Sequence, residues 1–297
     1  MVSDSVEQAA RRYVPGRGAV SIERLGRGLV NESHRVVRDG RAYSLRMPAA
    51  QPAPSGVDRE WECRVLALAS AAGIAPMIEC CEPRLGVLVA RWEEGRALRG
   101  DEARSPGAGA RVAGLMRRVH ALALPGDPRA LDPADWIEHY RDALRGDAAG
   151  ADALQAEAER RLGALQVLPR PVRVLCHSDL HPANLVATER GLVLLDWEYA
   201  HASEALWDVA GWACNNDLDP AVRDLLLASY LGRTPTADEA RRLEDLAWLY
   251  DYVCLLWSEL YSRAARPSDG RILERARTLA ERLARTAGGG AVELPAH

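Results

Sequence analysis

Short runs in which apolar and polar residues alternate fill the first third of the chain, and this alternation is typical of β-strands with one buried face. An Asp39-Gly40 pair stands between two of these runs, as expected for a tight hairpin turn. A segment farther along repeats apolar residues at helical spacing instead. We therefore expect one helix at 57–68 and five strands, at 21–25, 35–38, 41–47, 77–81 and 86–90.

From Asp101 onward the pattern changes to that of helices. Apolar residues recur every three or four positions, as at Val112, Leu115 and Val119, which marks one buried helix face. A long helix is expected at 151–165, and the Gly- and Ala-rich segment 104–110 is expected to be a loop.

These patterns predict an α+β protein with two lobes. Residues 1–92 are expected to form an antiparallel sheet with one helix. Residues 93–98 are a charged connector, and residues 99–297 are expected to form a mainly helical lobe.

Composition limits the classes of function that remain open. The 297 residues are 48% apolar, which is ample for a core, and no uninterrupted apolar run reaches the roughly 18 residues needed to cross a membrane. Residues 1–12 are polar and lack the apolar core of a signal peptide, so we expect a cytoplasmic protein. A net charge of -4 argues against non-specific binding of nucleic acid. Nothing in these patterns indicates an oligomeric state.

The six cysteines show no CxxC spacing, and most of them lie in apolar runs. Small apolar side chains of this kind are typical of reduced, buried thiols. We therefore expect neither a disulfide nor a metal site among Cys63, Cys80, Cys81, Cys176, Cys214 and Cys254.

Three polar residues in the middle of the chain have the spacing that phosphoryl transfer requires. Asp179 follows a short apolar run that ends at Cys176, Asn184 comes five residues later, and Asp196 twelve residues after that. The apolar runs on either side of the polar turn 188–191 predict a hairpin that brings Asn184 and Asp196 to one end. One carboxylate can then accept a proton from a substrate hydroxyl, while an amide and a second carboxylate hold Mg²⁺. The competing interpretation is that the two aspartates only cap turns.

The two segments that carry these residues, HSDLHPANL and LLDWEYA, resemble the small-molecule branch of the protein-kinase-like fold. That branch holds the aminoglycoside phosphotransferases and the choline, ethanolamine and thiamine kinases. The resemblance implies that Asp179 is the catalytic base and that Asn184 and Asp196 bind Mg²⁺. It implies that Asp208 hydrogen-bonds the catalytic-loop backbone. An acid at the position of Glu198 is a feature of choline and thiamine kinases.

The third expected strand carries an arginine where a kinase normally has a phosphate-binding lysine. The chain contains no lysine, and all 38 basic residues are arginine. The guanidinium of Arg46 could bind phosphate through two parallel hydrogen bonds, as its counterpart does in choline kinases. Glu62 on the following helix is expected to pair with Arg46, with Glu60 as the second choice. The alternative is that Arg46 is an ordinary surface residue.

Two backbone segments complete the expected nucleotide site. Gly26, Gly28 and Asn31 lie in the turn between the first two strands, where the absence of a Cβ lets the backbone approach phosphates. Glu93 and Glu94 belong to the connector, whose backbone binds adenine in the family that the chain resembles.

A late helical segment is rich in aromatic residues. Trp and Tyr faces attract cations, and cages of such rings bind quaternary ammonium groups. We expect a substrate cage formed with Glu198 and with the aromatic residues Trp248, Tyr252, Trp257 and Tyr261. The alternative is that these rings are core, because a chain without Phe must fill its core with Trp and Tyr.

The resemblance, taken with these residues, implies a kinase that uses ATP and Mg²⁺ to phosphorylate a hydroxyl of a small alcohol. The acidic and aromatic residues favour a cationic alcohol of the choline, ethanolamine or thiamine type. One alternative is an aminoglycoside or sugar phosphotransferase, whose pocket should contain fewer aromatic rings. Another is a non-catalytic nucleotide-binding protein, which the missing lysine favours weakly.

Overall fold

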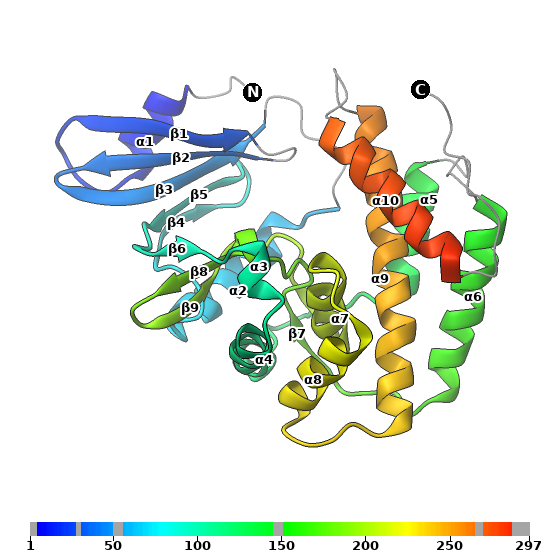
Figure 1. Ribbon diagram of the computed structural model, residues 1–297. Helices are drawn as coiled ribbons and strands as arrows, with labels where there is room; N and C mark the ends of the chain where they lie inside the picture. The colour runs from blue at the N-terminus through cyan, green and yellow to red at the C-terminus, as the bar shows by residue number, and fades with distance from the viewer. Residues whose placement is uncertain (1–4, 28–30, 50–55, 145–150, 265–269, 287–297) are drawn as a thin grey trace. The chain divides into compact units, whose positions relative to one another are not determined.

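The computed structural model describes residues 5–27, 31–49, 56–144, 151–264 and 270–286 (Figure 1). The chain divides into two compact units. The first unit comprises Met1–Arg99 with Pro182–Ala200, and the second comprises Gly100–His181 with His201–His297. The α+β class expected from the sequence is confirmed, while the expected lobe boundaries stay a prediction.

The first unit contains an antiparallel sheet of five strands in the order β1-β2-β3-β5-β4. Asp39 and Gly40, between β2 and β3, have φ angles of 50° and 73°, the left-handed values that a tight hairpin turn needs. All five strands lie close to their expected positions: β1 (Val20–Arg27), β2 (Asn31–Arg38), β3 (Arg41–Pro48), β4 (Ile78–Glu82) and β5 (Val87–Arg91).

Two helices accompany this sheet. Helix α2 (Arg59–Ala71) was expected, and Asp58 caps it by accepting a hydrogen bond from the backbone N–H of Trp61 at 2.9 Å. Helix α1 (Val6–Tyr13) was not expected, although Ser5 and Gln8 form the capping box that marks a helix start. The buried alanines of α1 pack with core residues of β2, β3 and β5.

The first unit also contains a three-stranded sheet in the order β6-β8-β9. Strands β8 (Leu185–Thr188) and β9 (Gly191–Leu194) form the hairpin expected from the sequence, and the short 3-10 turn η1 (Pro182–Asn184) leads into it. Strand β6 (Arg96–Ala97) lies in the expected connector and pairs with β8.

The second unit is mainly helical, and α9 contacts α5, α6, α7 and α10. Figure 1 shows α10 in red beside α9 in orange. The expected loop at 104–110 is wrong, because Ser105 caps a helix that begins at Pro106. The helices are α3 (Gly100–Ala103), α4 (Pro106–His120), α5 (Pro133–Ala143), α6 (Ala151–Val167), α7 (Leu206–Asn215), α8 (Pro220–Leu231), α9 (Ala237–Ala264) and α10 (Gly270–Thr286).

A two-stranded antiparallel sheet, β7 (Arg173–Cys176) with β10 (His201–Glu204), completes the second unit. Strand β7 is the run expected before Asp179. Within the residues that the structure describes, no helix has the length and apolar character needed to span a membrane.

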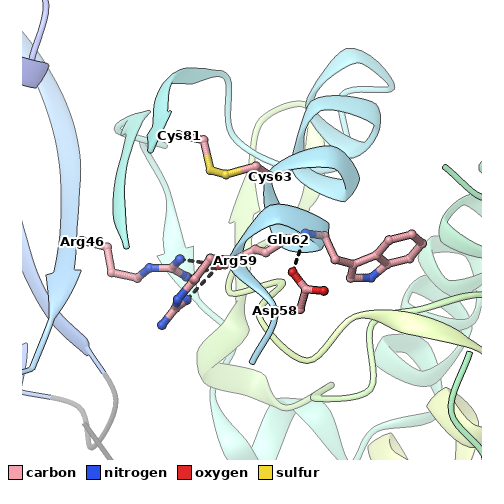
Figure 2. Close-up of a disulfide and its surroundings, with 7 residues drawn as sticks. Arg46, Asp58, Arg59, Glu62, Cys63 and Cys81 are labelled. Atoms are coloured by element: carbon pink, nitrogen blue, oxygen red, sulfur yellow. Dashed lines mark hydrogen bonds and ion pairs between the residues drawn. A yellow bond between two sulfur atoms is a disulfide. The ribbon is translucent and has the colours of Figure 1, made fainter. Parts of the chain in front are cut away.

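The expectation that all six cysteines are reduced is wrong for two of them. Cys63 on α2 and Cys81 on β4 form a disulfide (Figure 2). No spacing motif marks this pair, because it is created by the packing of a helix against a strand 18 residues later in the sequence. The remaining cysteines, Cys80, Cys176, Cys214 and Cys254, are free thiols.

Candidate active site

Arg46 on β3 and Glu62 on α2 form a bidentate ion pair (Figure 2). The Nη1 and Nη2 atoms of Arg46 donate to Oε1 and Oε2 of Glu62 at 2.6 and 2.7 Å. Burial alone would raise the pKa of Glu62, but Arg46 and Arg59 outweigh burial and hold that pKa below its ordinary value. The ion pair expected from the sequence is thus confirmed, and Glu60 is exposed.

Arg59, which was not among the residues predicted from the sequence, connects three groups of the same site. Its Nη1 donates to Oε2 of Glu62 at 2.8 Å and to Oε2 of Glu198 at 3.1 Å. Its Nη2 donates to Oδ1 of Asn31 at 2.8 Å. The three-residue step from Arg59 to Glu62 on one helix was the available signal, because residues at this spacing are neighbours.

Asn31 and Glu198 hold each other within this network. Nδ2 of Asn31 donates to Oε2 of Glu198 at 2.7 Å, and both side chains are buried. Burial and the neighbouring Asp196 carboxylate raise the pKa of Glu198 to about 7, against the opposing effect of Arg46 and Arg59. Glu198 thus belongs to the network formed by Asn31 and Arg59 beside the Arg46–Glu62 pair.

The glycine turn is described only in part. Gly26 lies near the end of β1 and pairs with Ser33, next to an irregularity in the β1–β2 register. Gly28 lies outside the described residues. The expected phosphate-binding role of Gly26, Gly28 and Asn31 stays a prediction.

Asn184 and Asp196 stand at the same end of the β8–β9 hairpin, as expected. Leu185 pairs with Leu194, and the backbone N–H of Leu195 donates to the carbonyl oxygen of Asn184 at 2.8 Å. Asp196 has a φ of 58°, a left-handed conformation that is uncommon outside glycine and is found at functional sites. Its side chain is 39% exposed. An amide oxygen and a carboxylate are oxygen ligands of the kind that Mg²⁺ prefers, so this donor set fits the metal.

Arg46 connects the ion pair to the end of the hairpin that carries Asn184 and Asp196. Its Nη1 lies 3.4 Å from Oδ1 of Asp196. Burial alone would lower the pKa of Arg46, but Glu62 and Asp196 keep it raised, so the guanidinium is permanently charged. A cation and a partly exposed carboxylate thus stand together in the first unit.

In the second unit, Asp208 on α7 fixes the loop that carries Asp179. Its Oδ2 and Oδ1 accept hydrogen bonds from the backbone N–H groups of His177 at 2.9 Å and Ser178 at 2.7 Å. His120 Nε2 lies 3.1 Å from Oδ2 of Asp208. Ser178 has a φ of 67°, so this contact maintains an unusual backbone conformation directly before Asp179. The hydrogen bonds to the loop backbone expected from the resemblance are confirmed.

Asp208→Asn is expected to destabilise the protein by about 2–3 kcal/mol, because the amide would turn an NH₂ group toward one of two buried N–H donors. Urea unfolding measures this change. Asp224 on α8 is exposed, so Asp224→Asn is the matched control, with an expected change within about 0.5 kcal/mol. Equal stability of the two variants would contradict the assigned role.

Asp179 is a partly exposed carboxylate that is ionised at neutral pH. Its side chain is 30% exposed, and Oδ2 lies 3.4 Å from Nε2 of His181. Burial would raise the pKa of Asp179, but His181, with smaller effects from His177 and Arg275, lowers it below its ordinary value. A reachable, ionised carboxylate can accept a proton.

Two tyrosines near Asp179 were not among the expected site residues. The hydroxyl of Tyr250 donates to the carbonyl oxygen of Ser178 at 3.5 Å. Burial raises the pKa of Tyr140, and the neighbouring Cys254, Tyr261 and Asp179 raise it further. The loop that carries Asp179 therefore has aromatic side chains beside it, as the spread of Tyr and Trp over α5 and α9 could have suggested.

The four expected cage residues form two separate ring pairs. The Trp257 and Tyr261 centroids lie 4.1 Å apart, and those of Trp248 and Tyr252 lie 5.6 Å apart. Trp248 and Trp257, the first residues of the two pairs, are nine positions apart, a rise of ~13.5 Å along α9 at 1.5 Å per residue. The guanidinium of Arg161 already occupies the Trp248 ring, at 5.2 Å. The four rings thus form two pairs, one of which already contacts a guanidinium, and the expected cage stays a prediction.

A cavity of about 820 Å³ lies at the connector of the first unit. Glu93, Glu94 and the β8–β9 turn line it, and Arg190 of that turn forms an ion pair with Glu93 at 2.8 Å. Arg46 and Asp196 are not among its lining residues. The adenine-binding role expected for the connector stays a prediction.

The pattern of the phosphotransferase enzyme family (APH) matches residues 21–246. The probable choline kinase 2 of Arabidopsis thaliana is 22% identical over 272 residues, which cover 80% of this chain and 68% of that protein.

Solved structures share the fold. A choline/ethanolamine kinase family protein from Mesorhizobium loti has a TM-score of 0.75 at 23% identity, over 93% of this chain and 92% of that one. LicA in complex with AMP has a TM-score of 0.76 at 18% identity, over 94% of this chain and 97% of that one. Because the family pattern covers most of the sequence, the chain belongs to the phosphotransferase enzyme family.

Proposed function

We propose that the protein transfers the γ-phosphate of ATP to a hydroxyl of a small cationic alcohol of the choline, ethanolamine or thiamine type. The observation that carries this proposal is Asp179, an ionised and partly exposed carboxylate on a loop that Asp208 holds in place. Such a group can orient the acceptor hydroxyl and take its proton as the oxygen attacks phosphorus.

The phosphate side of the reaction falls to residues of the first unit. Arg46, kept charged and oriented by Glu62, would bind the phosphates through its guanidinium. Asn184 and Asp196 would hold Mg²⁺, which when bound neutralises charge on the phosphate oxygens. Gly26, Gly28 and Asn31 would contribute the turn that covers the phosphates, and the backbone at Glu93 and Glu94 would bind adenine. Positioning and charge neutralisation then supply most of the rate enhancement.

The acceptor class follows from the aromatic residues near Asp179. Tyr140 and Tyr250 are buried, Tyr261 lies beside Tyr140, and the Tyr261 ring contacts that of Trp257 with their centroids 4.1 Å apart. Rings of this kind bind ammonium and quaternary ammonium groups. The curated relative named above as a choline kinase supports the same class.

One observation favours a second candidate, an amino-sugar or sugar acceptor. Arg275 on α10 donates to Oδ1 of Asn215 at 3.1 Å, and Asn215 donates to the carbonyl oxygen of Leu180, next to Asp179, at 3.0 Å. A guanidinium this near the catalytic loop repels a simple cation but donates hydrogen bonds to sugar hydroxyls.

The test is Mg²⁺-dependent ADP release measured against choline, ethanolamine, thiamine, an aminoglycoside, an amino sugar and a neutral sugar. We expect turnover with one of the three cationic alcohols and kcat/KM for it at least about tenfold above that for the sugars, which corresponds to 1.4 kcal/mol. Preference for a sugar would support the second candidate. Nucleotide binding without turnover on any acceptor would contradict both and indicate a binding protein.

A further inference from the structure

The Cys63–Cys81 disulfide stands directly beside the ion pair that orients Arg46 (Figure 2). Cys63 follows Glu62 on α2, and Cys81 lies on β4, an edge strand of the five-stranded sheet. Both cysteines are half-buried, so a small thiol can reach them. Two consecutive residues of α2 therefore carry the helix's ionic link and its covalent link to the sheet.

The register of the sheet shows that both links reach residues that lie side by side across neighbouring strands, in one row of the sheet. Leu88 on β5 pairs with Arg46 on one side and with Cys81 on the other. The two attachment points are thus two strands apart in one row, ~10 Å at 4.7–4.9 Å per strand. Rotation or sliding of α2 over the sheet would move Glu62 away from Arg46. The disulfide restrains both motions because it attaches the helix to the sheet at a second point.

We propose that the Cys63–Cys81 cystine positions Glu62, and that nucleotide binding therefore depends on the oxidation state of these two sulfurs. This inference rests on the proposed function, in which Arg46 contacts the phosphates. A bidentate ion pair needs two aligned hydrogen bonds, and these weaken steeply when the geometry shifts. The first turn of α2 is also held by Arg59, which donates to Asn31, and by the indole N–H of Trp61, which donates to the carbonyl oxygen of Ala200. At its last turn, the Ser70 hydroxyl accepts a hydrogen bond from the backbone N–H of Ile78 on β4 at 3.3 Å, so the cystine is the covalent link among several contacts.

Reduction is a balanced exchange with a dithiol. One thiolate of the dithiol attacks a cystine sulfur, which breaks the S–S bond and forms a mixed disulfide. The second thiol of the reagent then displaces the protein sulfur and closes a cyclic disulfide. Two electrons and two protons pass to the protein, which leaves Cys63 and Cys81 as thiols.

Thermodynamic linkage gives a second consequence. If the cystine strengthens nucleotide binding by some factor, bound nucleotide must stabilise the cystine against reduction by the same factor. This reciprocity distinguishes a positioning role from a purely structural one. In a protein that stays folded, a cystine that only stabilises the fold changes neither the nucleotide affinity on reduction nor its own resistance to reduction when nucleotide binds.

The test uses the full chain in its oxidised form and after treatment with dithiothreitol. Calorimetry measures the Kd for ADP with Mg²⁺, and acceptor KM and circular dichroism are recorded alongside. We expect reduction to raise the Kd at least about fivefold, the lower end of typical coupling, without change in acceptor KM or in secondary structure. Reoxidation should restore the Kd, and saturating ADP should shift the dithiol concentration needed for half-reduction by the same factor.

Variants make the assignment specific. Cys63→Ala with Cys81→Ala should show the Kd of the reduced protein and no response to dithiothreitol. Cys80→Ala, next to Cys81 on the same strand and not part of the disulfide, should behave like the parent. An unchanged Kd and an unchanged half-reduction point would overturn the inference while leaving the proposed function intact. Absence of ADP binding in every redox state would instead overturn the proposed function, and this inference with it.

Discussion

Asp179→Asn is expected to lower kcat by about 10²–10⁴-fold, the usual contribution of a positioned base. The amide is nearly isosteric with the carboxylate but cannot take the proton from the substrate hydroxyl. Because Arg46, Asn184 and Asp196 are untouched, the Kd for ADP with Mg²⁺ should stay within about twofold. Steady-state ADP release and calorimetry measure the two quantities on the same preparation.

The matched control for this change is Asp238→Asn on α9. Asp238 is exposed and forms an ion pair with a surface arginine three residues away, Arg241, so the variant should keep the parent kcat. Since the pKa of Asp179 lies below its ordinary value of 3.8, protonation of this group should cause no loss of rate between about pH 7 and pH 5. A kcat for Asp179→Asn within threefold of the control would remove the residue from the mechanism.

The elements that could be predicted are those whose information is local. The Asp39-Gly40 turn specifies a hairpin through backbone conformations that these residues tolerate, and the structure has that turn. The spacing of Asn184 and Asp196 around a polar turn placed both at one end of a hairpin for the same reason. Helical periodicity put Glu62 on the helix that packs against Arg46.

The features that could not be predicted depend on packing between distant segments. The Cys63–Cys81 pair arises from the position of a helix over an edge strand, which no local pattern records. The ring of Trp248 lies against Arg161, a residue of another helix, so aromatic composition alone could not separate core rings from substrate-facing ones.

Glu62→Gln is expected to reduce the free energy of unfolding by about 3–5 kcal/mol, the usual cost of removing one partner from a buried ion pair. Glu62 is 1% exposed and accepts hydrogen bonds from both Arg46 and Arg59, so its loss leaves two guanidinium groups in a site with too little negative charge. The same variant should raise the Kd for ADP with Mg²⁺ by about tenfold or more, because Arg46 loses the carboxylate that orients it. Urea unfolding and calorimetry provide the two readouts.

The pH dependence of this stability loss has a definite direction. The folded-state pKa of Glu62 lies below its ordinary value of 4.5, so the carboxylate stabilises the protein fully above that pH. The contribution of Glu62 to the difference between parent and variant should therefore shrink as the pH falls through its folded-state pKa. Glu60→Gln, two residues earlier on the same helix and exposed, should stay within about 0.5 kcal/mol of the parent at every pH. If both variants lost equal stability, the buried pair with Arg46 would not be what holds α2 to the sheet, and the positioning of Arg46 would need another explanation.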